Sequence, residues 1–195
     1  IRRGSNLLLN AKEDCKIVKC FRWMNHAMIW QQQRSKADTR KWIKSGRNNK
    51  DHYILQNEHE RFASLPDFHD SSDRNGRWRP FQLAFILMNL ESATNPKSEE
   101  RDIVDLIWFP TGGGKTEAYL GLAAFTILYR RIKGAESWNW NKYGGTTVFM
   151  RYTLRLLTTQ QYERAASMIC ACDLIRKDNE AELGDEPISI GLWVG

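Results

Sequence analysis

Residues 103–116 have the sequence Ile-Val-Asp-Leu-Ile-Trp-Phe-Pro-Thr-Gly-Gly-Gly-Lys-Thr. The first half is a mostly apolar run of strand length that ends before a proline, which is typical of a strand covered on both faces. A glycine-rich stretch and Lys-Thr follow, and residues 117–132 then have an unbroken helical pattern. Strand, glycine loop, Lys-Thr and helix in this order predict a phosphate-binding loop.

Each residue of this loop has a physical role in holding a nucleotide. Gly112, Gly113 and Gly114 lack the side chains that would block a backbone curling around phosphate oxygens. The helix that begins there adds the positive end of its dipole. Lys115 would reach the outer phosphates, and the Thr116 hydroxyl would ligate Mg²⁺. We therefore predict that the chain binds a nucleotide with Mg²⁺, with Lys115 and Thr116 as the catalytic residues; the family resemblance described below implies that this nucleotide is ATP.

The segments around the loop predict an α/β fold. Apolar runs of strand length recur at 146–151 and 188–194, and helical patterns cover 81–90 and 158–176. Strands that alternate with helices in this way form a parallel sheet with helices on both faces. We expect residues 78–195 to be the first, incomplete part of a P-loop domain that binds its ligands at the carboxyl ends of the strands.

The part of the chain before this domain differs from it in charge. Residues 1–50 contain 13 Lys and Arg against 3 Asp and Glu, a balance of +10, whereas the whole chain carries +6. Residues 15–28 have an amphipathic helical pattern that packs on a core. The apolar residues of this predicted helix are Ile17, Phe21, Met24 and Met28. We expect residues 1–77 to form a basic, mostly helical extension, whose charge suits a polyanion and equally suits a solvated helix face.

Composition narrows the class of protein. A chain of 195 residues that is 42% hydrophobic and 27% charged has enough apolar residues for a folded core. No apolar run reaches the roughly 20 residues of a membrane-spanning helix, so we expect no membrane partner. The cysteines form no C-x-x-C pair, which favours reduced thiols of a cytoplasmic protein over a zinc site or disulfides. The first residue is Ile1 rather than Met, which predicts a piece of a longer protein.

Three short elements resemble the motifs of superfamily 2 helicases and translocases. They are Trp-Arg-Pro-Phe-Gln at 78–82, Pro-Thr-Gly-Gly-Gly-Lys-Thr at 110–116 and Tyr-Thr-Leu-Arg-Leu-Leu-Thr-Thr-Gln at 152–160. The resemblance implies a RecA-like fold in which Gln82 contacts the adenine and in which Arg79 and Thr111 also bind the nucleotide. The nucleic-acid residues that it implies are Arg151, Thr153, Arg155 and Gln160. The last element departs from the family pattern by an extra Leu154 and by Tyr152 in place of proline.

Longer strings are most similar to the DrmA helicases of the DISARM anti-phage systems. Examples are Trp-Phe-Pro-Thr-Gly-Gly-Gly-Lys-Thr-Glu-Ala-Tyr-Leu-Gly at 108–121 and Ile-Gly-Leu-Trp-Val-Gly at 190–195. This resemblance covers residues 78–195, with weaker cover of 15–34. It implies an ATP-dependent DNA helicase or translocase that works on DNA with other subunits of a phage-defence system. A nucleotide-gated module that binds nucleic acid or protein without sustained translocation is the alternative.

Hydrolysis by such an enzyme needs an acidic motif at the end of a later strand. The only Asp-Glu dipeptide, Asp185-Glu186, precedes a predicted strand, so we interpret it as a turn. The chain ends at Gly195, before the acidic motif is expected. We therefore predict that these 195 residues do not turn over ATP alone.

Overall fold

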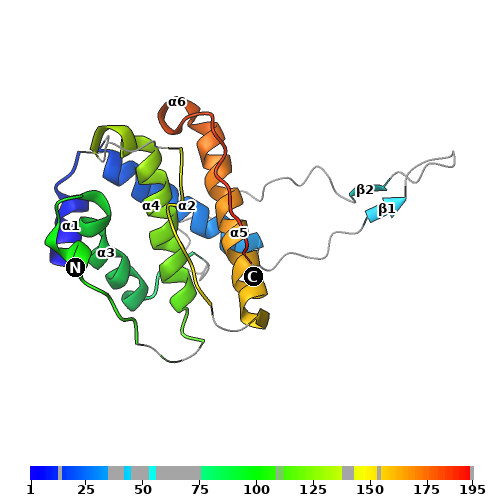
Figure 1. Cartoon of the computed structure of the whole chain (residues 1–195), viewed down its shortest axis with the longest axis horizontal. Coiled ribbons are helices and arrows are strands. Elements are labelled where there is room, and N and C mark those ends of the chain that lie inside the picture. Colours follow the sequence, from blue (N-terminus) through cyan, green and yellow to red (C-terminus); the bar gives the residue numbers. More distant parts are fainter. Residues whose placement is uncertain are drawn as a thin grey trace.

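The computed structural model describes residues 1–12, 15–34, 42–44, 53–55, 76–108, 110, 112–137, 143–152 and 155–193. This part of the chain is mostly helical (Figure 1). The helices are α1 (Arg2–Leu9), α2 (Lys16–Arg34), α3 (Pro80–Thr94), the 3-10 helix η1 (Glu99–Asp102), α4 (Lys115–Ser137), α5 (Arg155–Asp178) and α6 (Glu180–Leu183). Two short strands, β1 (Trp42–Lys44) and β2 (Tyr53–Leu55), pair antiparallel, and Ile43 is the register partner of Ile54.

The predicted α/β fold with a parallel P-loop, RecA-like sheet is wrong. Within the described residues the pairing of β1 with β2 is the only strand pairing, and the segments 103–108, 146–151 and 188–193 are extended without a ladder. A parallel sheet requires hydrogen bonds between neighbouring strands and helices over both faces. Segment 103–108 is instead open to solvent, since Val104 is 93% and Leu106 87% exposed. The described fold is therefore mainly α.

The predicted helices, in contrast, are confirmed. The ranges 15–28, 81–90, 117–132 and 158–176 correspond to α2, α3, α4 and α5. Helix α2 packs against α4 and α5, and α3 packs against α1 and α4 (Figure 1). The core between them contains large side chains with at most 2% exposure, among them Met24, Phe125 and Met168. Each such burial contributes about 1.5–3 kcal/mol to folding. Among the described helices, none is both long enough and apolar enough to cross a lipid bilayer.

Two of the predicted strand segments lie along these helices. Val148 and Met150 pack against the core, whereas Phe149 between them is 78% exposed. Ile188 and Ile190 repeat the same pattern two residues apart. Alternation with period two is the pattern of an extended chain that has one covered face. It explains why the sequence predicts strands here, although the backbones form no ladder.

The cysteines are free thiols. Cys170 is exposed and Cys172 is fully buried, so they lie on different sides of α5, as predicted. Burial raises the pKa of the Cys172 thiol to about 12, which keeps it protonated at neutral pH. In the described ranges, no three His, Cys, Asp or Glu side chains come together in a way that would hold a metal ion.

Candidate nucleotide site

The glycine loop, residues 112–114, leads directly into α4. Gly112 has φ +79° and Gly114 has φ +86°, a left-handed backbone that side chains disfavour. A Cβ on Gly114 would lie 2.7 Å from Nε2 of Gln82, whereas nothing lies within 4 Å of a Cβ on Gly112. The Gly113 N–H donates to the Pro110 carbonyl at 3.1 Å. The predicted Thr111 lies outside the described residues.

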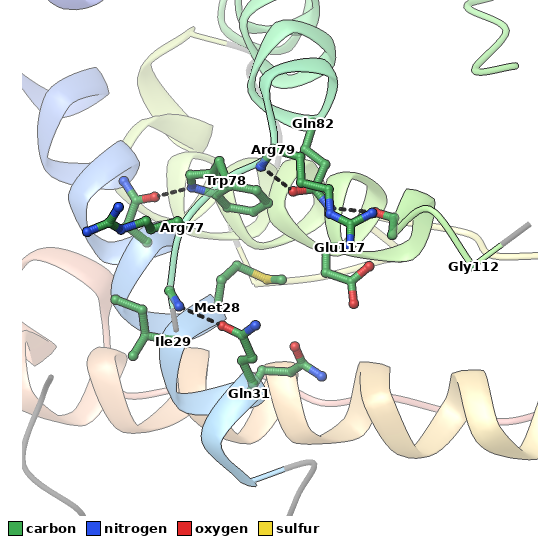
Figure 2. A pocket seen from close by; sticks show the side chains of 13 residues that line it. Met28, Ile29, Gln31, Arg77, Trp78, Arg79, Gln82, Gly112 and Glu117 are labelled. Atoms are coloured by element: carbon green, nitrogen blue, oxygen red, sulfur yellow. Dashed lines mark hydrogen bonds between the residues drawn. The ribbon is translucent and has the colours of Figure 1, made fainter. Parts of the chain in front are cut away.

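Two side chains from the start of α3 hold this loop (Figure 2). Arg79 Nη1 donates to the Gly113 carbonyl at 2.8 Å, and Gln82 Nε2 donates to the Gly114 carbonyl at 2.7 Å. Gln82 Oε1 also accepts the Arg79 N–H at 2.8 Å, which caps α3. A trans peptide points its carbonyl and the following N–H in opposite directions. The N–H groups of Gly114 and Lys115 therefore point away from the start of α3.

The two residues predicted to be catalytic lie in the first turn of α4, which begins at Lys115. The Lys115 ammonium donates to the Pro110 carbonyl at 3.2 Å. Thr116 is half-buried. The structure thus brings Arg79, Gln82, the glycine loop and Lys115 together at one end of α4.

Glu117, the next residue of α4, is part of the site although the sequence analysis did not select it. Its Oε1 forms an ion pair with Arg164 of α5. Its Oε2 is buried and has no hydrogen-bond partner among the described residues. A carboxylate beside a phosphate loop repels anions, and the Arg164 guanidinium offsets this charge. An acidic residue in the first turn of a helix stabilises the positive end of the helix dipole. From the sequence, Glu117 therefore indicated only a stable helix start.

A pocket of about 210 Å³ lies between the glycine loop and α2 (Figure 2). Sites that enclose whole drug-sized ligands are larger, about 300–1,000 Å³, so this pocket has room for one ring system. Its lining residues are Asn25, Met28, Ile29, Gln31, Gln32, Gly76, Arg77, Trp78, Arg79, Gln82, Gly112, Gly114 and Glu117. The wall formed by α2 was not predicted, because two glutamines at the end of an amphipathic pattern look like solvent-facing residues.

Hydrogen bonds tie the segment before α3 to this wall. Trp78 Nε1 donates to Asn25 Oδ1 at 2.7 Å, and the Gly76 N–H donates to Gln32 Oε1 at 2.9 Å. Trp78 belongs to the same short element as Arg79 and Gln82. The element that holds the glycine loop is therefore also bonded to α2, and the pocket lies between these two attachments.

Those of the predicted nucleic-acid residues that the structure describes lie just before α5 and in its first turns. Arg151 is exposed, α5 begins at Arg155, and Gln160 is exposed one turn later. Thr153 lies outside the described residues. The ion pair from Arg164 to Glu117 links this part of α5 to the first turn of α4. A DNA surface here stays a prediction.

Comparison with known proteins gives one strong similarity. No protein-family model matches the chain. Over all 195 residues the chain is 46% identical to the DISARM protein DrmA of Bacillus paralicheniformis (strain ATCC 9945a / NCIMB 11709 / CD-2), and it spans 15% of the length of that protein.

Proposed function

We propose that the chain is the nucleotide-binding part of an ATP-driven helicase or translocase that acts on DNA in phage defence. The glycine loop carries the proposal, because its two left-handed glycines lie between Gln82 of α3 and Lys115 at the start of α4. The 46% identity to the DISARM protein DrmA supports the defence role and work with other subunits of such a system.

The residues of the loop fit a chain of phosphates. The N–H groups of Gly114 and Lys115 point away from the side chains that hold the loop, and the α4 dipole adds positive potential on the same side. The open space beside the Gly112 Cα leaves room for a ligand. On binding, Lys115 would exchange its bond to the Pro110 carbonyl for one to a phosphate oxygen. Mg²⁺ held by the Thr116 hydroxyl would neutralise phosphate charge.

The DNA part of the proposal involves Arg151, Arg155 and Gln160, together with Thr153. Arg151 and Gln160 are exposed to solvent near the start of α5. Because Arg164 binds Glu117, this part of α5 is attached to the turn that follows the glycine loop. A nucleotide that moved the start of α4 would therefore act on the proposed DNA contacts through this ion pair.

Calorimetric titration of the 195-residue chain with ATP tests the nucleotide site. Lys115→Ala removes one charge-assisted bond to a phosphate, so its affinity should fall about 10- to 100-fold. The matched control is Lys97→Ala, an exposed lysine in the loop after α3, which should bind ATP like the unmodified chain. Failure of the unmodified chain to bind ATP, or equal binding by Lys115→Ala, would refute the nucleotide assignment.

The salt dependence of binding to a short DNA duplex tests the DNA part. Each lost phosphate contact should reduce the slope of log affinity against log salt by about 0.9. We expect this reduction for Arg151→Ala. Neutralising Arg40, Lys41 and Lys44 together in the basic extension separates DNA binding from docking of another subunit. An unchanged slope in the triple variant assigns that surface to docking, and an unchanged slope for Arg151→Ala contradicts the proposed contact.

A further inference from the structure

The indole of Trp78 lies between α2 and α4, directly before the residues that hold the glycine loop. Its Nε1–H donates to Asn25 Oδ1 of α2 at 2.7 Å. The Asn25 amide in turn donates to the Phe21 carbonyl of its own helix at 2.9 Å, which fixes the acceptor. The outer edge of the ring lies against α4, since a Cβ on Gly121 would lie 2.6 Å from Cη2 of the indole. The side chain is thus held from two sides.

Gly121 has no other evident reason to be a glycine. It lies inside α4, where glycine is among the poorest helix formers. A Cβ there would meet the indole and, at 3.1 Å, Cδ1 of Ile86 on α3. Gly121 is not one of the residues that line the pocket beside the loop. A substitution at residue 121 therefore reaches that pocket through the side chains that pack on it.

The residue after Trp78 holds the glycine loop (Figure 2). Consecutive Cα atoms are about 3.8 Å apart, so a shift of Trp78 moves the backbone of Arg79 as well. Arg79 donates from its side chain to the Gly113 carbonyl. Its backbone N–H binds Gln82 Oε1, and the same Gln82 amide donates to the Gly114 carbonyl. The place of the indole therefore affects both donors that hold the loop.

We propose that Trp78 is a positioning residue of the nucleotide site. The indole, placed by Asn25 and Gly121, fixes the start of α3, and through it the direction of the loop N–H groups. The inference rests on the proposed function, since it requires phosphates at the glycine loop. Donors that are aimed in advance bind an anion better than donors that must first be ordered. If Trp78 only filled the core, its loss would change stability and leave the affinity for ATP as it is.

The test is a double-variant cycle in ATP affinity, measured by calorimetric titration of the 195-residue chain. Gly121→Ala adds a methyl group against the indole, so its affinity should fall about tenfold, the factor of one good hydrogen bond. Trp78→Phe removes the N–H and the outer ring atoms, and its affinity should fall about threefold to tenfold. The double variant should bind no more weakly than Trp78→Phe, because the methyl group then has no indole to displace.

Gly191→Ala is the matched control, since a Cβ there meets nothing within 4 Å, and its affinity should equal that of the unmodified chain. Thermal melting of the nucleotide-free variants shows which of them fold. A lower melting temperature for Trp78→Phe with unchanged affinity would assign the indole to packing and overturn the proposal. Losses that multiply in the double variant would also overturn it, because Gly121 would then act without the indole.

The remaining outcomes separate the inference from the proposed function. The inference alone fails if the unmodified chain binds ATP, Lys115→Ala loses this binding, and both Gly121→Ala and Trp78→Phe keep it in full. Absence of ATP binding by the unmodified chain refutes the proposed function, and the positioning role with it.

Discussion

Two regions of this protein hold backbone carbonyls with side chains, and they differ in how completely their polar groups are paired. At the arginine clamp, Arg176 binds the carbonyls of Gly184 and Asp185 at 3.1 Å each, and Arg131 binds those of Glu186 and Pro187 at 2.7 and 2.9 Å. Both arginines are buried, with 3% and 6% exposure. The clamp thus fastens four consecutive residues, 184–187, to α4 and α5.

The glycine loop is held by two side-chain hydrogen bonds in the described structure, against four at the clamp. Arg79, which donates to the Gly113 carbonyl, is exposed, whereas Gln82, which donates to the Gly114 carbonyl, is buried. Among the described residues, the Gln31 amide makes no hydrogen bond, and one buried oxygen of Glu117 has no partner in the adjoining pocket. Fully paired buried networks stabilise one structure, whereas unpaired groups beside a pocket cost stability unless a ligand binds them. We infer that the clamp serves folding and that the loop serves binding.

The largest expected effect is on the clamp. Arg176→Met removes both carbonyl contacts and leaves Asp173 without the bond of 2.7 Å from Arg176 Nε. Breaking a buried ion pair from one side costs about 3–5 kcal/mol, and urea unfolding should show this loss. Lys177→Met is the matched control. Lys177 pairs with the same carboxylate from an exposed position at 3.6 Å, so its loss should cost less than about 1 kcal/mol. Similar losses of unfolding free energy for the two variants would contradict the stabilising role of the clamp.

The next effect compares two glycines that have similar positive φ angles, Gly184 and Gly112. Gly184 has φ +84° and ψ +170°, and a Cβ there would clash with the hydroxyl and the ring of Tyr143. Gly184→Ala should therefore lower the free energy of unfolding by about 2–3 kcal/mol. Gly112→Ala meets open space, so only the backbone cost of about 1 kcal/mol applies, together with weaker ATP binding. Equal destabilisation by both substitutions would show that the surroundings of residue 184 do not matter.

The sequence predicts the helices well because a helix bonds to itself and its apolar spacing is local. The same local pattern at 103–109 predicts a strand, but strand pairing depends on segments far away along the chain, and the described residues make no such pairing. The role of Arg131 could not be predicted for the same reason. In the sequence it looks like a cation that stabilises the negative end of a helix dipole, but in the structure it donates to the Glu186 carbonyl, 55 residues away. Gln31 looks like a surface residue in the sequence, and only its packing places it in a pocket.

A smaller difference in stability is expected between leucine variants of two glutamines in the candidate site. The Gln82 amide is hydrogen-bonded, whereas the Gln31 amide is not among the described residues. Gln82→Leu leaves the Gly114 carbonyl and the Arg79 N–H without their partner, which should cost about 1–2 kcal/mol. Gln31→Leu, the same change on a neighbouring wall, should cost no stability. Thermal melting of the two nucleotide-free variants measures the difference. A loss for Gln31→Leu as large as that for Gln82→Leu would show that both amides are structural.

The smallest effect is a dependence of stability on pH. It is expected at the clamp, which contains the titratable carboxyl of Asp173, and not at the uncharged Gln82 amide that holds the glycine loop. Burial on its own would raise the pKa of the Asp173 carboxyl, but the bond from Arg176, the Ile188 N–H and the charges of Arg176 and Lys177 lower it below its ordinary value. A lowered folded-state pKa stabilises the protein above the pKa of the unfolded chain, and this contribution disappears as the pH falls through the folded-state pKa. The free energy of unfolding should therefore fall more steeply below about pH 4 in the unmodified chain than in Asp173→Asn. Urea unfolding between pH 2 and pH 6 measures both slopes, and parallel curves would mean that the carboxylate of Asp173 adds nothing to the clamp.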